Sequence, residues 1–245
     1  MKKNILISNG HQPFNQLIAD FLIENGHSVH LLFDDEEAEL TYFEKIASHN
    51  QHLYKGFVVN KMSEENLQQV LDRMIEHSGS IDVFIHGNEM VDEEELLLDD
   101  MNQFETYITE QFKKIFLLNK LVSSMMIKKK QGSIIFPIVY DALYFAGYSS
   151  SPILNHGKIS MMKCLSRELT AFRLTVNVMT FGYYHNNFGK EEKKEVLKKL
   201  GIYSLKPQLL ELTQLISALN LLINLPSTAI SGQDIHIGTG IETGL

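Results

Sequence analysis

The sequence predicts a single α/β domain over residues 1–245, built as a doubly wound parallel β-sheet with helices on both faces. Three observations predict this fold. Apolar runs typical of buried strands alternate with amphipathic helical patterns along the whole chain. At 245 residues and 44% hydrophobic composition, the chain is long enough for a full α/β core. No repeat or linker interrupts the alternation.

The first half of the chain supplies four predicted strands, over residues 4–8, 28–33, 57–59 and 81–85. Helical patterns follow two of them, over residues 13–25 and 64–76. Pro13 suits the first turn of the earlier helix, Gly26 closes that helix, and the Ser63 hydroxyl is suited to cap the later one. The apolar character of the fourth strand is typical of burial on both faces.

The second half continues the alternation. Helices are predicted over residues 101–129, 153–172, 191–200 and 209–225, and strands over residues 134–136, 175–179 and 234–237. Gly132 is expected to end the longest helix, and a polar, aromatic stretch over residues 140–151 precedes the next helix. Seven strands and about six helices fit one sheet covered on both faces.

The composition argues against several classes of partner. The formal net charge is −8, with acidic runs at residues 34–39 and 92–95, so neither nucleic acid nor an anionic membrane surface is expected to bind. The same runs are also typical of solvated loops. A signal peptide and an 18-residue apolar span are not expected, which favours a cytoplasmic location. The lone Cys164 excludes an internal disulfide and is expected to serve packing.

The turn after the first strand lacks the glycines of a dinucleotide site. Those glycines let the backbone approach a pyrophosphate at the N-terminus of the following helix. This chain has Asn9, Pro13 and Asn15 there, and Pro13 removes one N–H that an anion could use. Asp34 and Asp35 follow the second strand, where a ribose-binding acid is sought. The pattern predicts weak or absent binding of dinucleotides.

Several phrases nonetheless resemble the short-chain dehydrogenase/reductase family, in the expected order and over essentially the whole chain. They lie at residues 81–85, 112–118, 163–169, 176–178 and 232–237. The resemblance implies a Rossmann-like fold, an NAD(P)-dependent oxidoreductase activity, and pairing of subunits through the helices at residues 101–129 and 153–172. Those helices are apolar most of the way round, which also predicts a homo-oligomer, either a dimer or a tetramer.

The functional positions that the resemblance implies carry other residues here. The glycines of the family's first turn fall on Asn9, Pro13 and Asn15, after Ser8. The Asn-Asn-Ala-Gly segment falls on His86, Gly87, Asn88 and Glu89. The asparagine of the long helix falls on Gln111, and the catalytic serine falls on or next to Val139. The Tyr-x-x-x-Lys pair falls on Ser151 and Asn155.

These replacements bear on the chemistry. The resemblance implies a tyrosine whose phenol donates a proton to the substrate. A nearby lysine lowers the pKa of that phenol and also holds the cofactor ribose. A serine hydroxyl such as Ser151 is far less acidic than a phenol, and a neutral amide such as Asn155 supplies no tuning charge. The leading interpretation is a pseudoenzyme or atypical member that binds a small molecule or a partner subunit. The alternative is a working carbonyl or enoyl reductase with relocated groups, of which Tyr148 and Lys158 are candidates; a solvated Lys158 is favoured over a functional one.

The remaining candidate positions are those that would meet a cofactor. They are Ser8, Asn9, His11, Phe14, Asp34, Asn60, His86, Gly87 and Gly182. NAD(H) is expected to bind weakly if at all, and NADP(H) less well, because Asp34 and Asp35 would repel a 2′-phosphate. No metal is expected at His11 or His86, because no acidic or cysteine partner lies at ligand spacing. The resemblance also implies a substrate lid after Gly182, over residues 183–212, whose aromatic start either lines a pocket or caps the lid.

Overall fold

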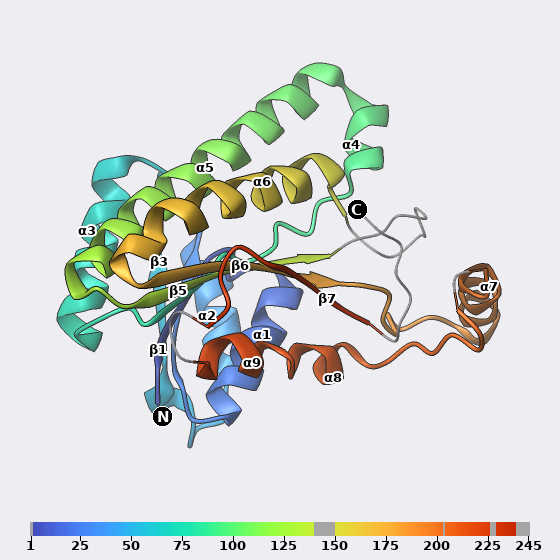
Figure 1. Ribbon diagram of the computed structural model, residues 1–245, viewed down its shortest axis with the longest axis horizontal. Helices are drawn as coiled ribbons and strands as arrows, with labels where there is room; N and C mark the ends of the chain where they lie inside the picture. The colour runs from blue at the N-terminus through green and yellow to red at the C-terminus, as the bar shows by residue number, and fades with distance from the viewer. Residues whose placement is uncertain (1, 140–149, 203, 226–228, 239–245) are drawn as a thin grey trace.

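The computed structural model describes residues 2–139, 150–202, 204–225 and 229–238, and these form one seven-stranded parallel sheet (Figure 1). The strand order is β3-β2-β1-β4-β5-β6-β7. The strands are β1 (Asn4–Ile7), β2 (Ser28–Phe33), β3 (Tyr54–Val58), β4 (Val83–Ile85), β5 (Gly132–Val139), β6 (Leu174–Phe181) and β7 (Asp234–Ile237). The predicted fold class is confirmed. The order reverses between β1 and β4, and ligands of such sheets bind at that switch point, outside the carboxyl ends of the strands.

Helices cover both faces of the sheet (Figure 1). One face carries α1 (Pro13–Glu24), α2 (Glu36–Lys45), α8 (Leu212–Ile216) and α9 (Leu219–Asn224). The other face carries α3 (Glu64–Ser78), α5 (Met101–Lys129) and α6 (Pro152–Leu169). Two helices lie off the faces: α4 (Glu93–Asp99) packs against the start of α5, and α7 (Lys190–Leu200) projects from the body. Short 3-10 turns occupy Gln51–Leu53 and Thr170–Phe172.

The core consists of two apolar layers separated by the sheet. Successive side chains of a strand point to opposite faces. In β1, Ile5 and Ile7 pack with α1 in one layer, and Leu6 packs with α3 and α5 in the other. All three are fully buried, so the central strand is held from both sides. This rigid centre fixes the positions of the residues that follow β1 and β4.

Several sequence expectations differ from the observed elements. No helix was expected at residues 36–45, yet α2 forms there because the Asp35 carboxylate accepts a hydrogen bond from the Ala38 N–H and caps it. The third strand starts three residues earlier than expected, at Tyr54. The helix expected over residues 209–225 is two short helices, α8 and α9, with a turn between them at Ser217 and Ala218.

Two single-residue expectations were also wrong. The long helix ends at Lys129, and the residue that caps it is Lys130, which adopts a left-handed conformation with φ of 53°. Gly132 instead begins β5. Cys164 is exposed, so it does not serve core packing. The cap at Ser63 is confirmed, because its hydroxyl accepts a hydrogen bond from the Asn66 N–H at 3.3 Å.

Candidate active site

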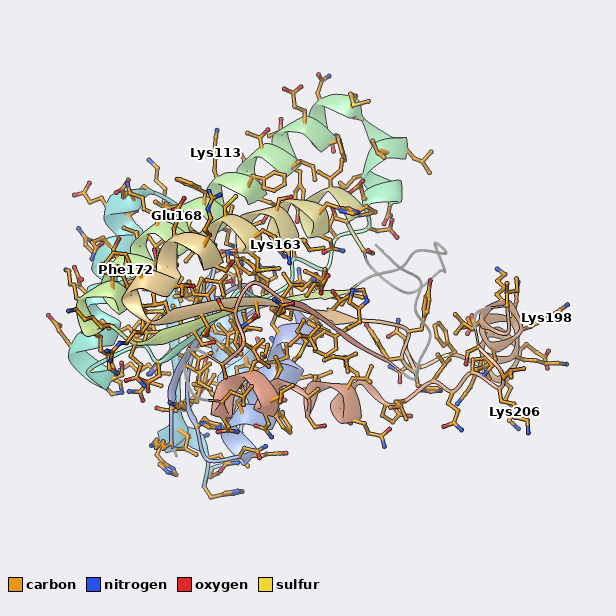
Figure 2. All side chains as sticks on the ribbon, in the orientation of Figure 1. Lys113, Lys163, Glu168, Phe172, Lys198 and Lys206 are labelled. Atoms are coloured by element: carbon orange, nitrogen blue, oxygen red, sulfur yellow. The ribbon has the colours of Figure 1, made fainter. Side chains whose placement is uncertain are left out.

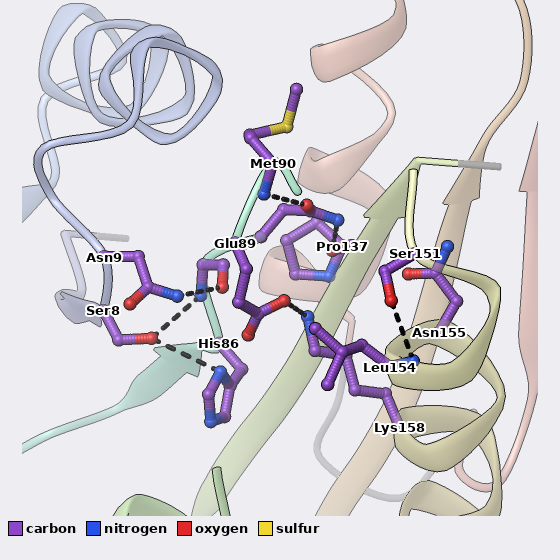
Figure 3. Close-up of polar contacts among 12 residues, drawn as sticks. Ser8, Asn9, His86, Glu89, Met90, Pro137, Ser151, Leu154, Asn155 and Lys158 are labelled. Atoms are coloured by element: carbon purple, nitrogen blue, oxygen red, sulfur yellow. Dashed lines mark hydrogen bonds and ion pairs between the residues drawn. The ribbon is translucent and has the colours of Figure 1, made fainter. Parts of the chain in front are cut away.

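The loops after β1 and β4 meet at the switch point and are joined by hydrogen bonds (Figure 3). The Ser8 hydroxyl accepts from the Gly87 N–H at 3.0 Å and lies 3.4 Å from Nδ1 of His86. The Asn9 amide donates to the Gly87 carbonyl at 2.8 Å. Asn9 takes the left-handed conformation, with φ of 54°, that a glycine adopts without strain. The structure therefore brings Ser8, Asn9, His86 and Gly87 together. Their role in binding a cofactor stays a prediction.

Asn15 ties the same two loops from the first turn of α1. Its Nδ2 donates to the carbonyls of Asn9 and Asn88, at 2.9 and 2.8 Å, and its Oδ1 accepts from the Asn88 N–H at 2.9 Å. Asn15 is fully buried. A Cβ at Gly87 would collide with the Ser8 carbonyl and the Asn15 amide, so only glycine fits there. All the polar atoms of the Asn15 side chain are used inside the protein.

The start of α1 is poor in groups that could hold an anion. Pro13 occupies the first turn and contributes no N–H, and Gln12 makes no side-chain cap. Phe14 is buried against Phe181, with ring centroids 5.3 Å apart, so it belongs to the core. His11 is partly exposed beside Asp34, and burial is the main cause that lowers the pKa of its imidazole.

A cavity of about 490 Å³ opens at the carboxyl ends of β2 and β3. Asp34, Asn60, Gln111 and Lys114 are among the residues that line it. The Lys114 ammonium donates to both Asp34 oxygens, at 3.0 and 3.3 Å. Asp35 is used as the cap of α2. The negative charge expected here is thus partly compensated, which weakens the argument from Asp34 and Asp35 against NADP(H).

His86 directly follows β4 and begins the loop at the switch point. It is fully buried, and its ring stacks on Phe136 with centroids 5.4 Å apart and an interplanar angle of 14°. Burial lowers the pKa of His86 well below its ordinary value, and the charges of Lys158 and Lys114 act in the same direction. The imidazole is therefore neutral near pH 7.

Lys158 forms a buried ion pair with Glu89 (Figure 3). The Lys158 side chain is 0% exposed and that of Glu89 is 5% exposed, so the favoured interpretation of a solvated lysine was wrong. The second Glu89 oxygen has no hydrogen-bond partner within the described part of the chain. Glu89 is also one cause, after burial, that raises the pKa of Tyr107 to about 12. The spacing along α6 indicates the burial of Lys158. It lies four residues from Leu154 and from Met162, both buried, so it is on the inner face of the helix.

Ser151 and Asn155 have structural partners. The Ser151 hydroxyl caps α6 by accepting from the Leu154 N–H at 3.3 Å, and it donates to Oε2 of Glu93 at 2.5 Å. The Asn155 amide donates to the Val139 carbonyl at 2.9 Å. Tyr148 lies outside the described residues. Sequence reasoning did not single out Glu93, which the folding of α4 brings next to the start of α6.

The segment after β6 is split between core and surface. The Gly182 N–H donates to the Ile237 carbonyl and so extends the pairing of β6 with β7. Tyr183 and Tyr184 are 3% and 4% exposed and pack in the core, so the aromatics at the start of the lid region belong to the core. Within the described ranges, no group of three or more His, Cys, Asp or Glu side chains is placed to hold a metal ion.

Residues 3–196 match the family model described as short chain dehydrogenase, and the chain belongs to this family. Among its relatives is a 3-oxoacyl-[acyl-carrier-protein] reductase (FabG) of Vibrio cholerae, 22% identical over 98% of this chain and 97% of that protein. The FabG reductase of Escherichia coli K12 is 21% identical over the same shares.

Solved structures show the same fold over nearly the full chain. ElxO with NADP bound aligns with a TM-score of 0.74 at 20% identity and covers 97% of both chains. An NAD⁺-bound xylitol dehydrogenase aligns with a TM-score of 0.73 at 16% identity and covers 96% of this chain and 98% of that one.

No helix among the described residues is both long and apolar enough to cross a membrane.

Proposed function

We propose that this chain is a nicotinamide-dinucleotide-dependent oxidoreductase that reduces a carbonyl or enoyl group, with a proton donor at a position other than 151. The observation that carries the proposal is the cavity beside Asp34, because it lies outside the carboxyl ends of β2 and β3, on the side of the sheet where such folds bind ligands. Support also comes from the match to the family and from relatives named as reductases.

The residues present fit one half of the cofactor better than the other. The Asp34 carboxylate accepts hydrogen bonds of the kind that ribose hydroxyls donate, and the Asn60 amide lines the same cavity. The pyrophosphate half has Pro13 at the helix N-terminus and the Asn15 side chain at the turn. When bound, the cofactor supplies the hydride. We therefore expect NAD(H) to bind weakly, through its adenosine end.

Ser151, at the position of the family's proton-donating tyrosine, is unsuited to proton transfer. The Ser151 hydroxyl already donates to Glu93, and a serine hydroxyl is far less acidic than a phenol. The Lys158 ammonium is held by Glu89 and has no exposed surface. Tyr148 is the remaining candidate donor on sequence grounds, because it lies seven residues before Asn155, which resembles the wider Tyr-to-Lys spacing of the family's enoyl reductases.

Calorimetric titration with NADH and NADPH, followed by turnover of 3-oxoacyl and enoyl thioesters, tests the proposal. Tyr148→Phe is expected to lower kcat by about 10²-fold or more, the typical contribution of a general acid. Ser151→Ala is the matched control and should change kcat by less than about threefold, since it removes a cap and not the donor. The absence of dinucleotide binding refutes the proposal.

A non-catalytic member of the family is a second candidate function. The observation that favours it is that the side chains at positions 151, 155 and 158 all have internal partners. Such a protein binds a small molecule, or acts as a subunit beside an active relative. Dinucleotide binding without turnover of any carbonyl or enoyl substrate would favour this candidate over a reductase.

We also propose that the chain forms a homodimer or homotetramer through the outer faces of α5 and α6. Phe116 on α5 is 64% exposed, and Ile153 on α6 is 42% exposed. Phe172, which follows α6, is 39% exposed. Exposed apolar residues grouped on two adjacent helices are typical of a surface that a second subunit covers.

A further inference from the structure

A second polar groove lies along the open edge of the sheet. β3 is the last strand of the sheet on this side. The groove has a volume of about 440 Å³, and its lining includes Lys55, Arg73 and His77. Glu36 and Asn60 also border it, and Asn60 is shared with the cavity beside Asp34. The groove is therefore next to the candidate active site but has its own set of side chains.

The fold brings the three basic side chains together from two elements. Arg73 and His77 are four residues apart on α3, so they lie on one face of that helix. Lys55 is the second residue of β3, and it is in register with His30 on β2. The His30 ring contacts His77, with centroids 6.3 Å apart, so the strand pair and the helix converge on one place.

His30 packs against two residues of the groove and has no hydrogen-bond partner among the described residues. It is 2% exposed, and neither ring nitrogen has a hydrogen-bond partner among the described residues. Its ring packs against Phe57 and His77, which both line the groove. Buried polar atoms are almost always hydrogen-bonded, to protein, to water or to a ligand. The unpartnered imidazole next to two groove residues is therefore a second sign that a polar ligand or water belongs here.

The basic side chains of the groove make no ion pair within the described ranges. In the part of the chain that the structure describes, neither Lys55 nor Arg73 takes part in an ion pair, and Glu36 is the one acidic residue that lines the groove. Lysines often protect an exposed sheet edge from pairing with another strand, which accounts for Lys55. Edge protection does not account for Arg73 and His77, because they lie on α3.

We propose that this groove binds a phosphate monoester carried on a small organic molecule. Arginine recognises phosphate with a planar pair of N–H donors, and lysine and histidine add further donors and charge. The volume of the groove lies in the range of small-molecule sites and far exceeds that of a phosphate ion alone. Asn60 provides an amide for the neutral part of such a molecule. The site does not depend on the proposed oxidoreductase function, and it stands even if NADH does not bind.

Proton–nitrogen NMR of the histidine rings tests this site, with titrations of inorganic phosphate, adenosine 2′-phosphate and adenosine. We expect saturable shifts of His77 and His30 with the two phosphates and none with adenosine. Arg73→Gln is expected to weaken binding about tenfold, the value of a hydrogen bond to a charged group. The matched control is Lys198→Gln, which removes the same charge from α7, away from the body of the protein (Figure 2). It should change affinity by less than about twofold, because charges that far apart are screened by salt.

The two phosphates distinguish the source of the ligand. Tighter binding of adenosine 2′-phosphate assigns the phosphate to a nucleotide, and equal binding assigns it to a free or differently carried phosphate; either result supports the site. Three results would overturn the proposal: no saturable shift with either phosphate, equal affinity for adenosine, or equal weakening by Arg73→Gln and Lys198→Gln. An unchanged amide spectrum of Arg73→Gln without ligand shows that the variant is folded.

Discussion

A buried charge of either sign is stable only while its partner remains, and Lys158 and Glu89 illustrate this at the scale of single residues. Lys158→Met leaves the Glu89 carboxylate buried and unpaired, so the free energy of unfolding should fall by about 3–5 kcal/mol. The double variant Lys158→Met with Glu89→Leu should recover most of this loss, because no buried charge remains. Urea unfolding of the two variants measures both effects.

The control for that pair is exposed. Lys120 and Glu64 form an ion pair whose side chains are 50% and 57% exposed. Lys120→Met should change the free energy of unfolding by less than about 1 kcal/mol, because water screens the pair. If Lys158→Met were no more destabilising than Lys120→Met, the account of a buried, mutually dependent pair would be wrong.

Pro13 offers a second prediction at the residue scale. Replacing it with alanine adds one N–H to the first turn of α1, where an anion would meet the helix. If the chain binds NADH, Pro13→Ala should tighten binding about tenfold, since a hydrogen bond to a charged group contributes about 1.5–3 kcal/mol. Calorimetry measures the change, and Pro207→Ala in a loop serves as the control. Unchanged affinity in Pro13→Ala would exclude the helix N-terminus as the phosphate site.

At the scale of elements, helices with a strong apolar periodicity were predicted close to their observed bounds, and helices with a weak one were not. The long helix was expected at residues 101–129, and α5 has those bounds because its apolar stripe repeats over many turns. α2 was missed because Tyr42 is the one buried residue on it, so its acidic sequence resembles a solvated loop. The helix expected over residues 209–225 is rich in leucine and isoleucine on both sides of Ser217 and Ala218, so the apolar pattern gave no sign of the turn there.

The proposed subunit interface belongs to this scale as well. Phe116→Glu places a charge in the centre of the exposed face of α5, so it should dissociate the oligomer. Sedimentation velocity at micromolar protein measures the effect. The control is Leu205→Glu, at a residue that is 98% exposed beyond α7, which should leave the assembly intact. A wild-type chain that sediments as a monomer at the same concentration would contradict the proposal.

At the scale of the whole molecule, the place of the candidate site could be predicted but its contacts could not. The strand ends that carry Ser8 and His86 follow from the topology of a parallel sheet. The Lys158–Glu89 pair joins residues 69 positions apart. The family resemblance singles out the position of Glu89 but not that of Lys158, so it did not predict their pairing. The bonds of Asn15 likewise depend on the close approach of two loops, which only the folded chain reveals.

Buried histidines give the whole molecule a pH dependence. Burial, above all, lowers the pKa of His30 to about 4 and that of His86 well below 6.5. Between pH 6.5 and 4 the unfolded chain binds more protons than the folded chain. The free energy of unfolding therefore has its full histidine contribution above pH 6.5 and falls as the pH drops through this window. His30 alone should contribute a loss of roughly 3 kcal/mol across it.

The measurement is urea unfolding at pH 7.5 and pH 5 for the wild type and His30→Leu. Each chain is compared with itself, so a uniform loss of stability in the variant cancels. The variant should lose less stability than the wild type on acidification. Parallel profiles would show that His30 is not held neutral by the fold.

The pairing of β5 with β6 has a consequence for the dynamics of the chain. Eight residues of each strand are in register, from Gly132 with Leu174 to Val139 with Phe181, and every one is buried. Their amide protons should exchange with deuterated solvent only when the whole chain unfolds, whereas those of the edge strand β3 should exchange through local opening. A molecule seated in the β3 groove would then slow deuterium uptake at that edge first, while uptake in the β5–β6 ladder would report only on the total stability.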